Sequence, residues 1–565
     1  MPQHIRASGS GLDWPSYGFD LANTRHVDLN QISGANVASL VPEWRFDFGF
    51  HGRLETSPVV VGGTMYVTSG PVNEVVALDA ASGALKWRYE PAVGSSAPCC
   101  GLVNRGVAVA GKRVFFASID GRLHALDARS GRALWDVAVG DPRTGFSETM
   151  APLAWHDLVF IGSSGGEFGV RGSLSAYGQA DGRLRWRWWT VGPGWEGNYT
   201  ASVHGVSLHR NIAREKADAP KYRRSWMHGG GPIWMTPALD PATGVIYAGT
   251  GDPAASYNGS QRPGDNWYTD SIVALDALTG KMKWFYQETP HDVWDYDAGS
   301  PPVLFNARSG WRRVPAVGEA GKTGWLYVVD RRSGRPIRVS QAFVPQVNMY
   351  ERPRMSGYVT IRPGSEGGNM APIAFDPNLH LAFIAAVDRP DVYRVEGFTP
   401  WQPGAGQWLT GESHAVGFFT QFVCAVNVDT GRLVWRRATV GGRLEQPAEV
   451  ILGGVLSSGE LVFAASPDGK LFAFDGPTGR VMWKYDFGTP DAARVNQSWL
   501  ERLKNFLLPL KHWLFREPAP VYTAHIDAPP ISYEINGRQY VAIAVDISPQ
   551  LGTGSDAIVV FALPR

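Results

Sequence analysis

Short apolar runs separated by turn-forming residues recur along the chain. In six places a run ends in the turn Asp/Asn/Gly-x-x-(Ser/Thr/Asp)-Gly, and a tryptophan follows four residues after the glycine. The six tryptophans are Trp87, Trp135, Trp186, Trp284, Trp435 and Trp483, and two weaker copies at 238–244 and 328–334 lack this tryptophan. Each copy predicts a pair of antiparallel strands joined by a tight turn that needs glycine.

The spacing of these repeats predicts an all-β chain. Trp87 and Trp135 are 48 residues apart, which suits one four-stranded blade of a propeller. Six clear and two weaker copies predict an eight-bladed β-propeller with tryptophan-docking repeats, as a single domain over 1–565. The strand-like segments VPEWRFDFG and AIVVFALPR, near the two ends, could share a blade and close the ring. A solenoid or paired sandwiches would also repeat hairpins, but without a tryptophan at a fixed place after the turn.

An insertion at 490–522 interrupts the last repeats. Its segment QSWLERLKNFLLPLKHWLF carries apolar side chains at helical spacing with basic ones between them, and Pro509 would kink or split a helix there. The sequence therefore predicts an amphipathic helical segment. A helix covering the side of the propeller, a dock for a partner protein, a homodimer contact and a membrane-surface segment all stay open.

Composition and charge argue against several classes of function. Lys and Arg total 53 against 52 for Asp and Glu, so no excess of positive charge points to nucleic acid. No apolar run approaches the roughly 18 residues of a transmembrane span. The first residues, MPQHIRASGSGLDW, lack the apolar core of a signal peptide. We expect either a cytoplasmic protein or the mature form of an exported one.

The three cysteines include an adjacent pair, Cys99 and Cys100, while Cys424 lies in an apolar run typical of a core. Neighbouring Cα atoms are about 3.8 Å apart, below the usual range for a disulfide, so a bond between the pair would be strained. Two thiols side by side are the simpler interpretation. An oxidised pair would instead form a stiff ring and indicate an oxidising compartment.

Three aspartates, Asp292, Asp295 and Asp297, crowd the segment TPHDVWDYDAGSPP. Carboxylates held this close raise one another's pKa unless a cation offsets them. Residues two apart on an extended chain point to the same side, so Asp295 and Asp297 could reach one cation. Hard metal ions prefer such oxygen ligands. A solvated acidic loop is the plain alternative.

Five groups of residues together resemble the quinoprotein alcohol dehydrogenases. These are the tryptophan repeats, CCGLVNRG, IGSSGGEFGVRG, GTGDP followed by RPGDN, and TPHDVWDYD. That family consists of eight-bladed propellers that use pyrroloquinoline quinone (PQQ) and a metal ion to oxidise alcohols. The resemblance implies oxidation of a primary alcohol to the aldehyde, in the periplasm, with electrons passed to a c-type cytochrome. No CxxCH occurs in the chain, so the haem acceptor would be a separate protein.

The resemblance also implies where PQQ would be held. Cys99 and Cys100 match a vicinal disulfide that packs on one face of the quinone, and Trp234 matches a tryptophan on the other face. Lys322 matches a basic residue near the quinone oxygens. Further polar contacts are implied at Glu55, Arg105, Thr149, Ser164, Gly165, Gly166 and Asn369.

Four carboxylates are implied as metal ligands: Glu167, Asp252, Asp295 and Asp297. Asp295 matches the catalytic aspartate, which accepts the alcohol proton. Asp297 matches an extra aspartate that marks the lanthanide-dependent branch, where calcium enzymes usually have a small residue. Asp252 stands where the family has asparagine, and a fourth carboxylate suits a trivalent ion better. The resemblance therefore favours a lanthanide over Ca²⁺.

Several positions depart from the family. Pro232, Met370 and Leu452 stand where the family often has a hydroxyl residue or tryptophan, and AASYN replaces a shorter segment over the substrate pocket. These changes make methanol a doubtful substrate. A calcium-dependent dehydrogenase for a larger alcohol, a sugar or an aldehyde is the first alternative. A non-catalytic propeller scaffold, of the kind used in outer-membrane assembly, is the second.

Overall fold

The computed structural model describes residues 12–94, 98–443, 453–488, 524–547 and 555–565. The insertion predicted at 490–522 and Leu452 lie outside the described residues, so the amphipathic helix stays a prediction. No helix among the described residues is long and apolar enough to cross a membrane, as the sequence predicted.

Within the described residues, eight sheets have four or five strands. Five of them follow the chain in order, with the strands β3 (Val59–Val61), β4 (Thr64–Ser69), β5 (Glu74–Asp79) and β6 (Leu85–Tyr89); β7 (Ala108–Ala110), β8 (Arg113–Ser118), β9 (Arg122–Asp127) and β10 (Ala133–Ala138); β11 (Leu153–Trp155), β12 (Leu158–Ile161), β13 (Ser173–Gly178) and β14 (Leu184–Trp189); β17 (Ala238–Asp240), β18 (Val245–Gly249), β19 (Ser271–Asp276) and β20 (Met282–Gln287); and β21 (Val303–Ser309), β22 (Arg312–Glu319), β23 (Tyr327–Asp330) and β24 (Pro336–Val339).

The other three sheets include strands from distant parts of the chain. They contain β26 (Ala374–Asp376), β27 (Leu381–Asp388), β30 (Phe418–Asn427) and β31 (Leu433–Arg443); β1 (His26–Val27), β32 (Val455–Ser458), β33 (Leu461–Ser466), β34 (Lys470–Asp475) and β35 (Val481–Asp486); and β2 (Val41–Asp47), β36 (Ala524–His525), β37 (Ile531–Ile535), β38 (Arg538–Ile547) and β39 (Ala557–Ala562).

Smaller elements fill the connections. They are the helix α1 (Ile212–Tyr222), the 3₁₀ helices η1 (Val37–Ser39), η2 (Pro142–Thr144), η3 (Gly166–Phe168), η4 (Ser225–His228) and η5 (Gly259–Gln261), the hairpin β15 (Ser202–Val203) and β16 (Val206–Ser207), and a three-stranded sheet of β25 (Val359–Ile361), β28 (Asp391–Val395) and β29 (Gly411–Ala415).

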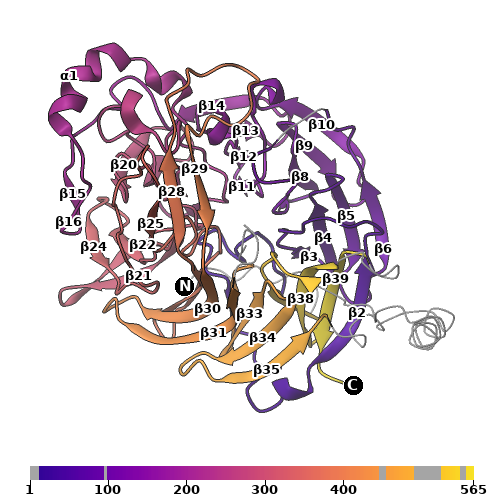
Figure 1. Ribbon diagram of the computed structural model, residues 1–565. Helices are drawn as coiled ribbons and strands as arrows, with labels where there is room; N and C mark the ends of the chain where they lie inside the picture. Colours follow the sequence, from indigo (N-terminus) through magenta and orange to yellow (C-terminus); the bar gives the residue numbers. More distant parts are fainter. Residues whose placement is uncertain (1–11, 95–97, 444–452, 489–523, 548–554) are drawn as a thin grey trace, which may run out of the picture.

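The large sheets surround a common centre, which is the arrangement of a β-propeller (Figure 1). The predicted all-β propeller is therefore confirmed. The number of blades stays a prediction.

Each repeat turn is built by its own side chains. In the first copy, the Asp79 carboxylate accepts hydrogen bonds from the N–H groups of Ala81 and Ser82 and from the Ser82 hydroxyl, at 2.9–3.2 Å. Gly83 then takes φ +73°, a conformation that other residues adopt only with strain. This explains why the turn favours a side-chain acceptor such as Asp at its first position and requires a glycine at its fifth.

The repeat tryptophans join neighbouring sheets. The ring of Trp284, on β20, packs on Gly334 of the next sheet, where an added Cβ would lie 2.7 Å from Cε3. Its Nε1–H donates to the carbonyl oxygen of Arg331 at 3.1 Å. The same pair of contacts recurs at Trp87, Trp135, Trp186 and Trp435. The predicted tryptophan docking is confirmed at these five positions.

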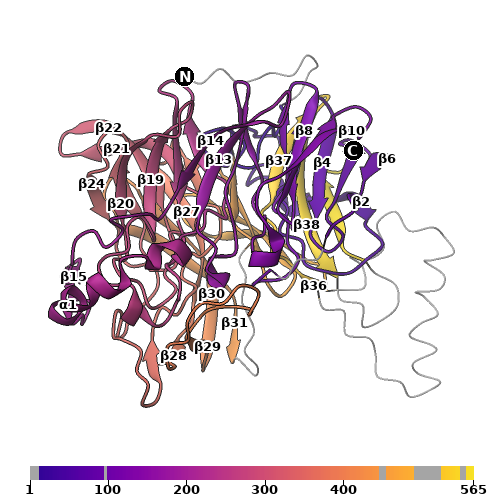
Figure 2. The same cartoon turned by 90° about the horizontal axis from the view of Figure 1, so that it is seen from above.

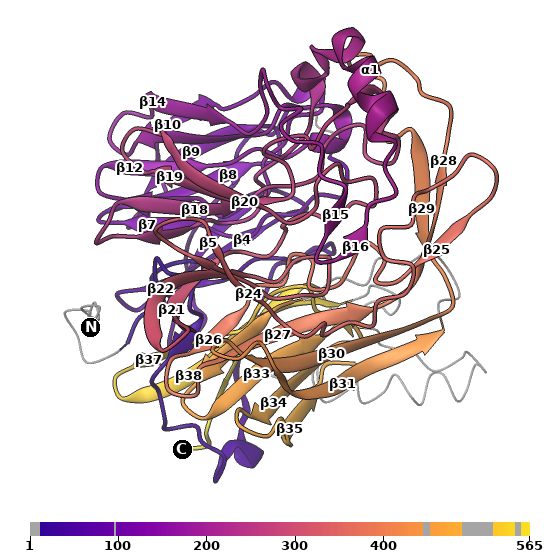
Figure 3. The ribbon, with the colours of Figure 1, turned by 90° about the vertical axis from the view of Figure 1, so that its left-hand side faces the viewer.

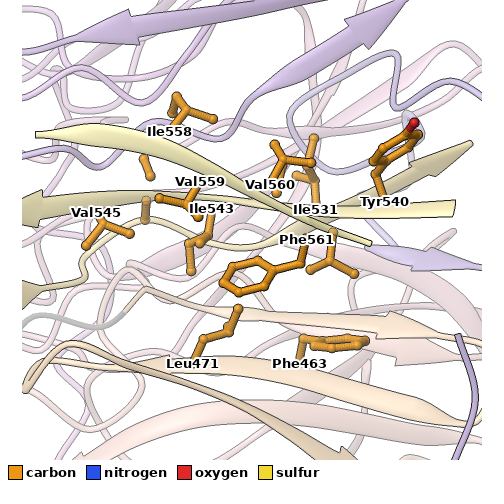
Figure 4. Packing of buried hydrophobic residues seen from close by; sticks show 14 of the residues in the cluster. Phe463, Leu471, Ile531, Tyr540, Ile543, Val545, Ile558, Val559, Val560 and Phe561 are labelled. Atoms are coloured by element: carbon orange, nitrogen blue, oxygen red, sulfur yellow. The ribbon is translucent and has the colours of Figure 1, made fainter. Parts of the chain in front are cut away.

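The two ends of the chain share one sheet, as predicted. Strand β2 pairs with β39 in antiparallel register, from Val41 opposite Ala562 to Asp47 opposite Ala557. Phe561 points from this sheet toward Phe463 and Leu471 of the neighbouring sheet (Figure 4). Burial of this continuous apolar layer stabilises the closed arrangement.

Antiparallel order divides the connections between two faces of the ring. Turns that join the first to the second strand, and the third to the fourth, lie on one face, which we call the turn face. Connections from the second to the third strand, and from one sheet to the next, lie on the other, which we call the site face. The sheet of β25, β28 and β29 and helix α1 lie on the site face (Figures 2 and 3).

Tryptophan docking can be tested with two glycines of one sheet. Gly334→Ala would place a Cβ 2.7 Å from Trp284 Cε3 on a backbone with φ +71°. It should therefore lower the free energy of unfolding by about 2–4 kcal/mol. Gly310→Ala has a φ of +62° but no atom within 4 Å of the new Cβ, so it should cost only about 1 kcal/mol. Urea unfolding of both variants measures the difference. Equal losses would show that docking contributes little beyond backbone strain.

Candidate active site

A cavity of about 400 Å³ opens among the connections of the site face. Every predicted site residue except Gly166 and Asp252 lines it: Glu55, Cys99, Cys100, Arg105, Thr149, Ser164, Gly165, Glu167, Trp234, Asp295, Asp297, Lys322 and Asn369. Asp252 lies directly behind the lining, and its N–H donates to Asp297 Oδ1 at 2.5 Å. The structure thus gathers residues separated by more than 300 positions.

The loop with the three aspartates, between β20 and β21, is held by the first of them. The Asp292 carboxylate accepts the N–H groups of Trp294 at 2.8 Å and Tyr296 at 2.7 Å. Arg262 donates to the Asp292 carbonyl oxygen. Asp292 therefore shapes the loop and does not line the cavity.

Asp295 and Asp297 both contact one ammonium group, but not through the extended backbone that their spacing predicted; their binding of a metal ion stays a prediction. Asp295 has φ +63°, in the left-handed region. The Lys322 ammonium lies 2.6 Å from Asp295 Oδ1 and 2.9 Å from Asp297 Oδ2. The turn of the loop, not strand alternation, brings the two carboxylates together.

Burial dominates the electrostatics of this group. Burial raises the pKa of Asp295. The positive charge of Lys322 opposes this rise, and the negative charge of Asp297 adds to it. Burial also raises the pKa of Asp252, with further contributions from Asp297 and Asp295. Burial alone would lower the pKa of Lys322, but Asp295 and Asp297 outweigh it, so the pKa is raised and the ammonium stays charged.

Two carboxylate oxygens have the environment that a metal ion would complete. Asp252 Oδ2 and Glu167 Oε2 are buried without a hydrogen-bond partner among the described residues. Oxygens of Asp252, Asp295 and Asp297 lie within 4.8 Å of one another. An oxygen of Glu167 lies instead within 4.8 Å of the sulfur atoms of Cys99 and Cys100. Burial raises the pKa of Glu167, and the charge of Asp297 raises it further. The donor set fits a hard cation.

Arg105 and Trp234 form a flat, positively charged wall. The guanidinium carbon lies 5.1 Å from the centre of the tryptophan ring, and Arg105 Nη2 pairs with Glu55 Oε2 at 2.6 Å. Arg53 pairs with the other Glu55 oxygen at 2.9 Å. This wall could bind an aromatic, anionic ligand by stacking and ion pairing.

Small residues bring the backbone close to the cavity. Gly165 has φ +96°, and a Cβ there would lie 2.2 Å from the Gly145 carbonyl oxygen. A Cβ on Gly166 would lie 2.7 Å from Pro232 Cδ. Beside them, the hydroxyls of Thr149 and Ser164 are 2.9 Å apart.

Cys99 and Cys100 are free thiols in the structure, so the implied disulfide is not confirmed. Hydrogen bonding to Cys100 raises the pKa of Cys99, and burial and Glu167 raise it further. Cys424 is buried in the core, as predicted.

Sequence reasoning missed an ion-pair network behind Asn369. Asn369 Nδ2 donates to Glu366 at 3.1 Å, Glu366 pairs with Arg389 at 3.1 Å, and Arg389 pairs with Asp391 at 2.8 Å. These residues come from two segments, 366–369 and 389–391, with no shared local pattern. The spacing of Glu366 and Asn369 in EGGN was the one available signal.

Strand β29 and the connection that precedes it were also missed as part of the site. Leu409, Ser413 and His414 line the cavity. The Tyr257 and Ser413 hydroxyls are 2.7 Å apart. The backbone N–H of Trp408 donates to the carbonyl oxygen of Glu167 at 2.5 Å. This segment covers the cavity and contacts the backbone of a predicted metal ligand.

Comparison with known proteins decides the family. The model described as "Glucose/ethanol/alcohol dehydrogenase, beta-propeller domain" matches residues 14–353. The chain belongs to the PQQ-dependent alcohol dehydrogenases. A second model, "Outer membrane protein assembly factor BamB", matches residues 415–501, which carry two of the tryptophan repeats.

Relatives of this quinoprotein alcohol dehydrogenase match over most of their length. The quinoprotein alcohol dehydrogenase PedH of Pseudomonas putida is 31% identical over 86% of this chain and 82% of that protein. The lanthanide-dependent methanol dehydrogenase of Methylacidiphilum fumariolicum is 34% identical over 84% of this chain and 80% of that protein. A europium-containing methanol dehydrogenase has a TM-score of 0.79 at 28% identity, covering 98% of each chain. The chain is an enzyme, and the scaffold alternative is wrong.

A pair of buried glutamates underlies the site loops. Glu288 precedes the aspartate loop, and burial and the neighbouring Glu319 raise its pKa. Glu319 accepts the N–H groups of Ser300 at 2.9 Å and Gly321 at 2.8 Å. Burial raises the pKa of Glu319 to about 8. Two carboxyl groups this close share a proton in the folded state.

Stability should therefore fall as pH rises through this pair. The folded pKa of about 8 exceeds the ordinary 4.5, so the stabilisation is complete below about 4.5 and is lost as pH rises through about 8. Between these two pH values, the free energy of unfolding of the wild type should fall by up to about 1.4 kcal/mol per pH unit relative to that of Glu288→Gln. Urea unfolding at several pH values measures the slope, with exposed Glu90→Gln as control. A slope unchanged by Glu288→Gln would refute the shared proton.

Proposed function

We propose that this enzyme oxidises a primary alcohol to the aldehyde with PQQ and one metal ion, a lanthanide in preference to Ca²⁺. The observation that carries the metal assignment is that oxygens of Asp252, Asp295 and Asp297 lie within 4.8 Å of one another, while one ammonium group, Lys322, pairs with the last two. With Glu167 added, four carboxylates face one lysine, Lys322. A trivalent ion offsets the three remaining charges, whereas a divalent ion leaves one.

When bound, PQQ supplies the two-electron oxidant and the metal ion supplies a Lewis acid. Asp295 accepts the hydroxyl proton of the alcohol at a carboxylate oxygen. Burial raises the pKa of Asp295 and Lys322 at 2.6 Å opposes that rise, a combination suited to a general base. Asp252, Asp297 and Glu167 hold the metal with Asp295.

The remaining residues bind and orient the cofactor. Trp234 would cover one face, and Cys99 and Cys100, which we propose to be joined by a disulfide, would cover the other and exclude water. Arg105, held by Glu55, would pair with a cofactor carboxylate. Further contacts would come from Thr149, Ser164, Gly165, Lys322 and Asn369, which line the cavity, and from Gly166 beside them.

We also infer the electron acceptor, the cellular compartment and the number of blades. We propose that a c-type cytochrome accepts the electrons, as the family resemblance implies. The proposed vicinal disulfide would require an oxidising compartment such as the periplasm. The eight large sheets formed by the described residues support an eight-bladed ring.

One observation favours the calcium-dependent alternative. Lys322 lies 2.9 Å from Asp297, so the lysine could offset the charge of the extra aspartate without a trivalent ion. The substrate could then be a larger alcohol, a sugar or an aldehyde.

Metal choice is tested with apo-protein reconstituted with PQQ and either La³⁺ or Ca²⁺. We expect dye-linked alcohol oxidation with La³⁺ only, and Asp297→Ala should lower La³⁺ affinity by about 100-fold in equilibrium dialysis, through loss of a ligand. Equal activity with Ca²⁺, retained by Asp297→Ala, would establish the calcium alternative.

The catalytic base is tested separately. Asp295→Asn keeps the shape of the side chain but cannot accept the proton, so kcat should fall by about 10²–10⁴-fold. PQQ binding, followed by absorbance, should persist because Trp234 and Arg105 are unchanged. A variant with near wild-type kcat would remove Asp295 from the proton transfer.

A further inference from the structure

The turn face carries an exposed group unrelated to the cavity. Trp311, in the turn between β21 and β22, is 80% exposed, the largest fraction among the large apolar side chains described. Arg312 lies over its ring at 4.3 Å. Arg308 precedes the same turn, and Arg332 and Arg335 lie in the turn between β23 and β24. We call these five residues the Trp311 patch.

The two turns belong to one end of one sheet. Because β21 to β24 are antiparallel, both turns lie opposite the connection that carries Lys322. Arg338 of β24 donates to the carbonyl oxygen of Arg308, which joins β24 to the end of β21 beside these turns. The patch therefore faces away from the cavity.

The acidic residues nearby are already engaged. Asp429 pairs with Arg313 at 2.6 Å, and Asp240 lies 3.6 Å from Arg331. Asp330 accepts the N–H groups of Arg332 at 3.0 Å and Ser333 at 2.9 Å, within its own turn. Among the described residues, none of the four arginines of the patch has a carboxylate within ion-pair distance.

We propose that the Trp311 patch attaches the enzyme to an anionic phospholipid surface. A single exposed apolar side chain is common, but a tryptophan with one guanidinium group over its ring and three more at the same end of the sheet combines the interfacial preference of indole with attraction to lipid phosphate. A protruding turn fits a yielding surface, whereas protein partners usually bury aromatic anchors in a packed interface.

The Trp311 patch also lies far from the face on which an electron acceptor would dock. An electron acceptor must approach the cofactor, and the patch is at the opposite end of the sheet from Lys322. Attachment through it would leave the cavity open to water and to a diffusing partner. The proposal therefore does not depend on the metal or on the acceptor.

The test is co-sedimentation of the holoenzyme with vesicles of phosphatidylcholine, with or without about one third phosphatidylglycerol. We expect binding to the anionic vesicles only, weakened by salt. Trp311→Ala and the double variant Arg332→Glu/Arg335→Glu should each weaken it by at least about tenfold, with alcohol oxidation unchanged.

The chain offers matched controls on the same face. Arg129 and Arg132 occupy the equivalent places in the turn DARSGR, so Arg129→Glu/Arg132→Glu makes the same change of charge away from Trp311. Leu278, 56% exposed in the turn after β19, controls for loss of an apolar side chain through Leu278→Ala. Both controls should bind as the wild type does.

Three outcomes would overturn the proposal. They are absence of wild-type binding to anionic vesicles, equal weakening by the control variants, and binding to polyglutamate in preference to vesicles. The last outcome would indicate an acidic protein partner.

Discussion

The contact of a tryptophan ring with a glycine of the next sheet is the interaction on which the rest of the structure depends. Glycine is needed twice at this point, because the turn has a positive φ and because a Cβ would enter the ring, as at Gly334 against Trp284. The indole N–H, bonded to a carbonyl of the same turn, prevents sliding. Each sheet is thereby fixed relative to its neighbour, and the connections of the site face converge.

The predictable part of the molecule was the part encoded locally. The turn and its tryptophan lie within nine residues, so one stretch of sequence carries the whole signal. The cavity residues were found through short motifs and their resemblance to a family. The network of Glu366, Arg389 and Asp391 and the cover formed by β29 and the connection that precedes it depend on contacts between distant segments without a characteristic pattern. The left-handed backbone of Asp295 was missed because it goes with hydrogen bonds that Asp292 makes within the loop and with a contact from Arg262 of another segment, which the sequence pattern does not reveal.

The site concentrates negative charge that the fold alone does not offset. Asp252, Asp295, Asp297 and Glu167 are gathered with one ammonium group, and oxygens of Asp252 and Glu167 lack donors. Carboxyl groups in this position either take up protons or bind cations. Stability of the loops around β20 and β21 and occupancy of the site are therefore coupled, since anything that binds the folded form alone stabilises it.

Pairing of β2 with β39 sets an order of events in biosynthesis. Glu55 follows β2, and Arg53 beside it pairs with Asp527 at 3.3 Å, a residue near the end of the chain. A nascent chain that has not yet released its last strands has neither the Arg53–Asp527 pair nor a closed ring. Loading of a cofactor must therefore follow completion of the polypeptide, and the ligand cannot serve as a template around which the early sheets assemble.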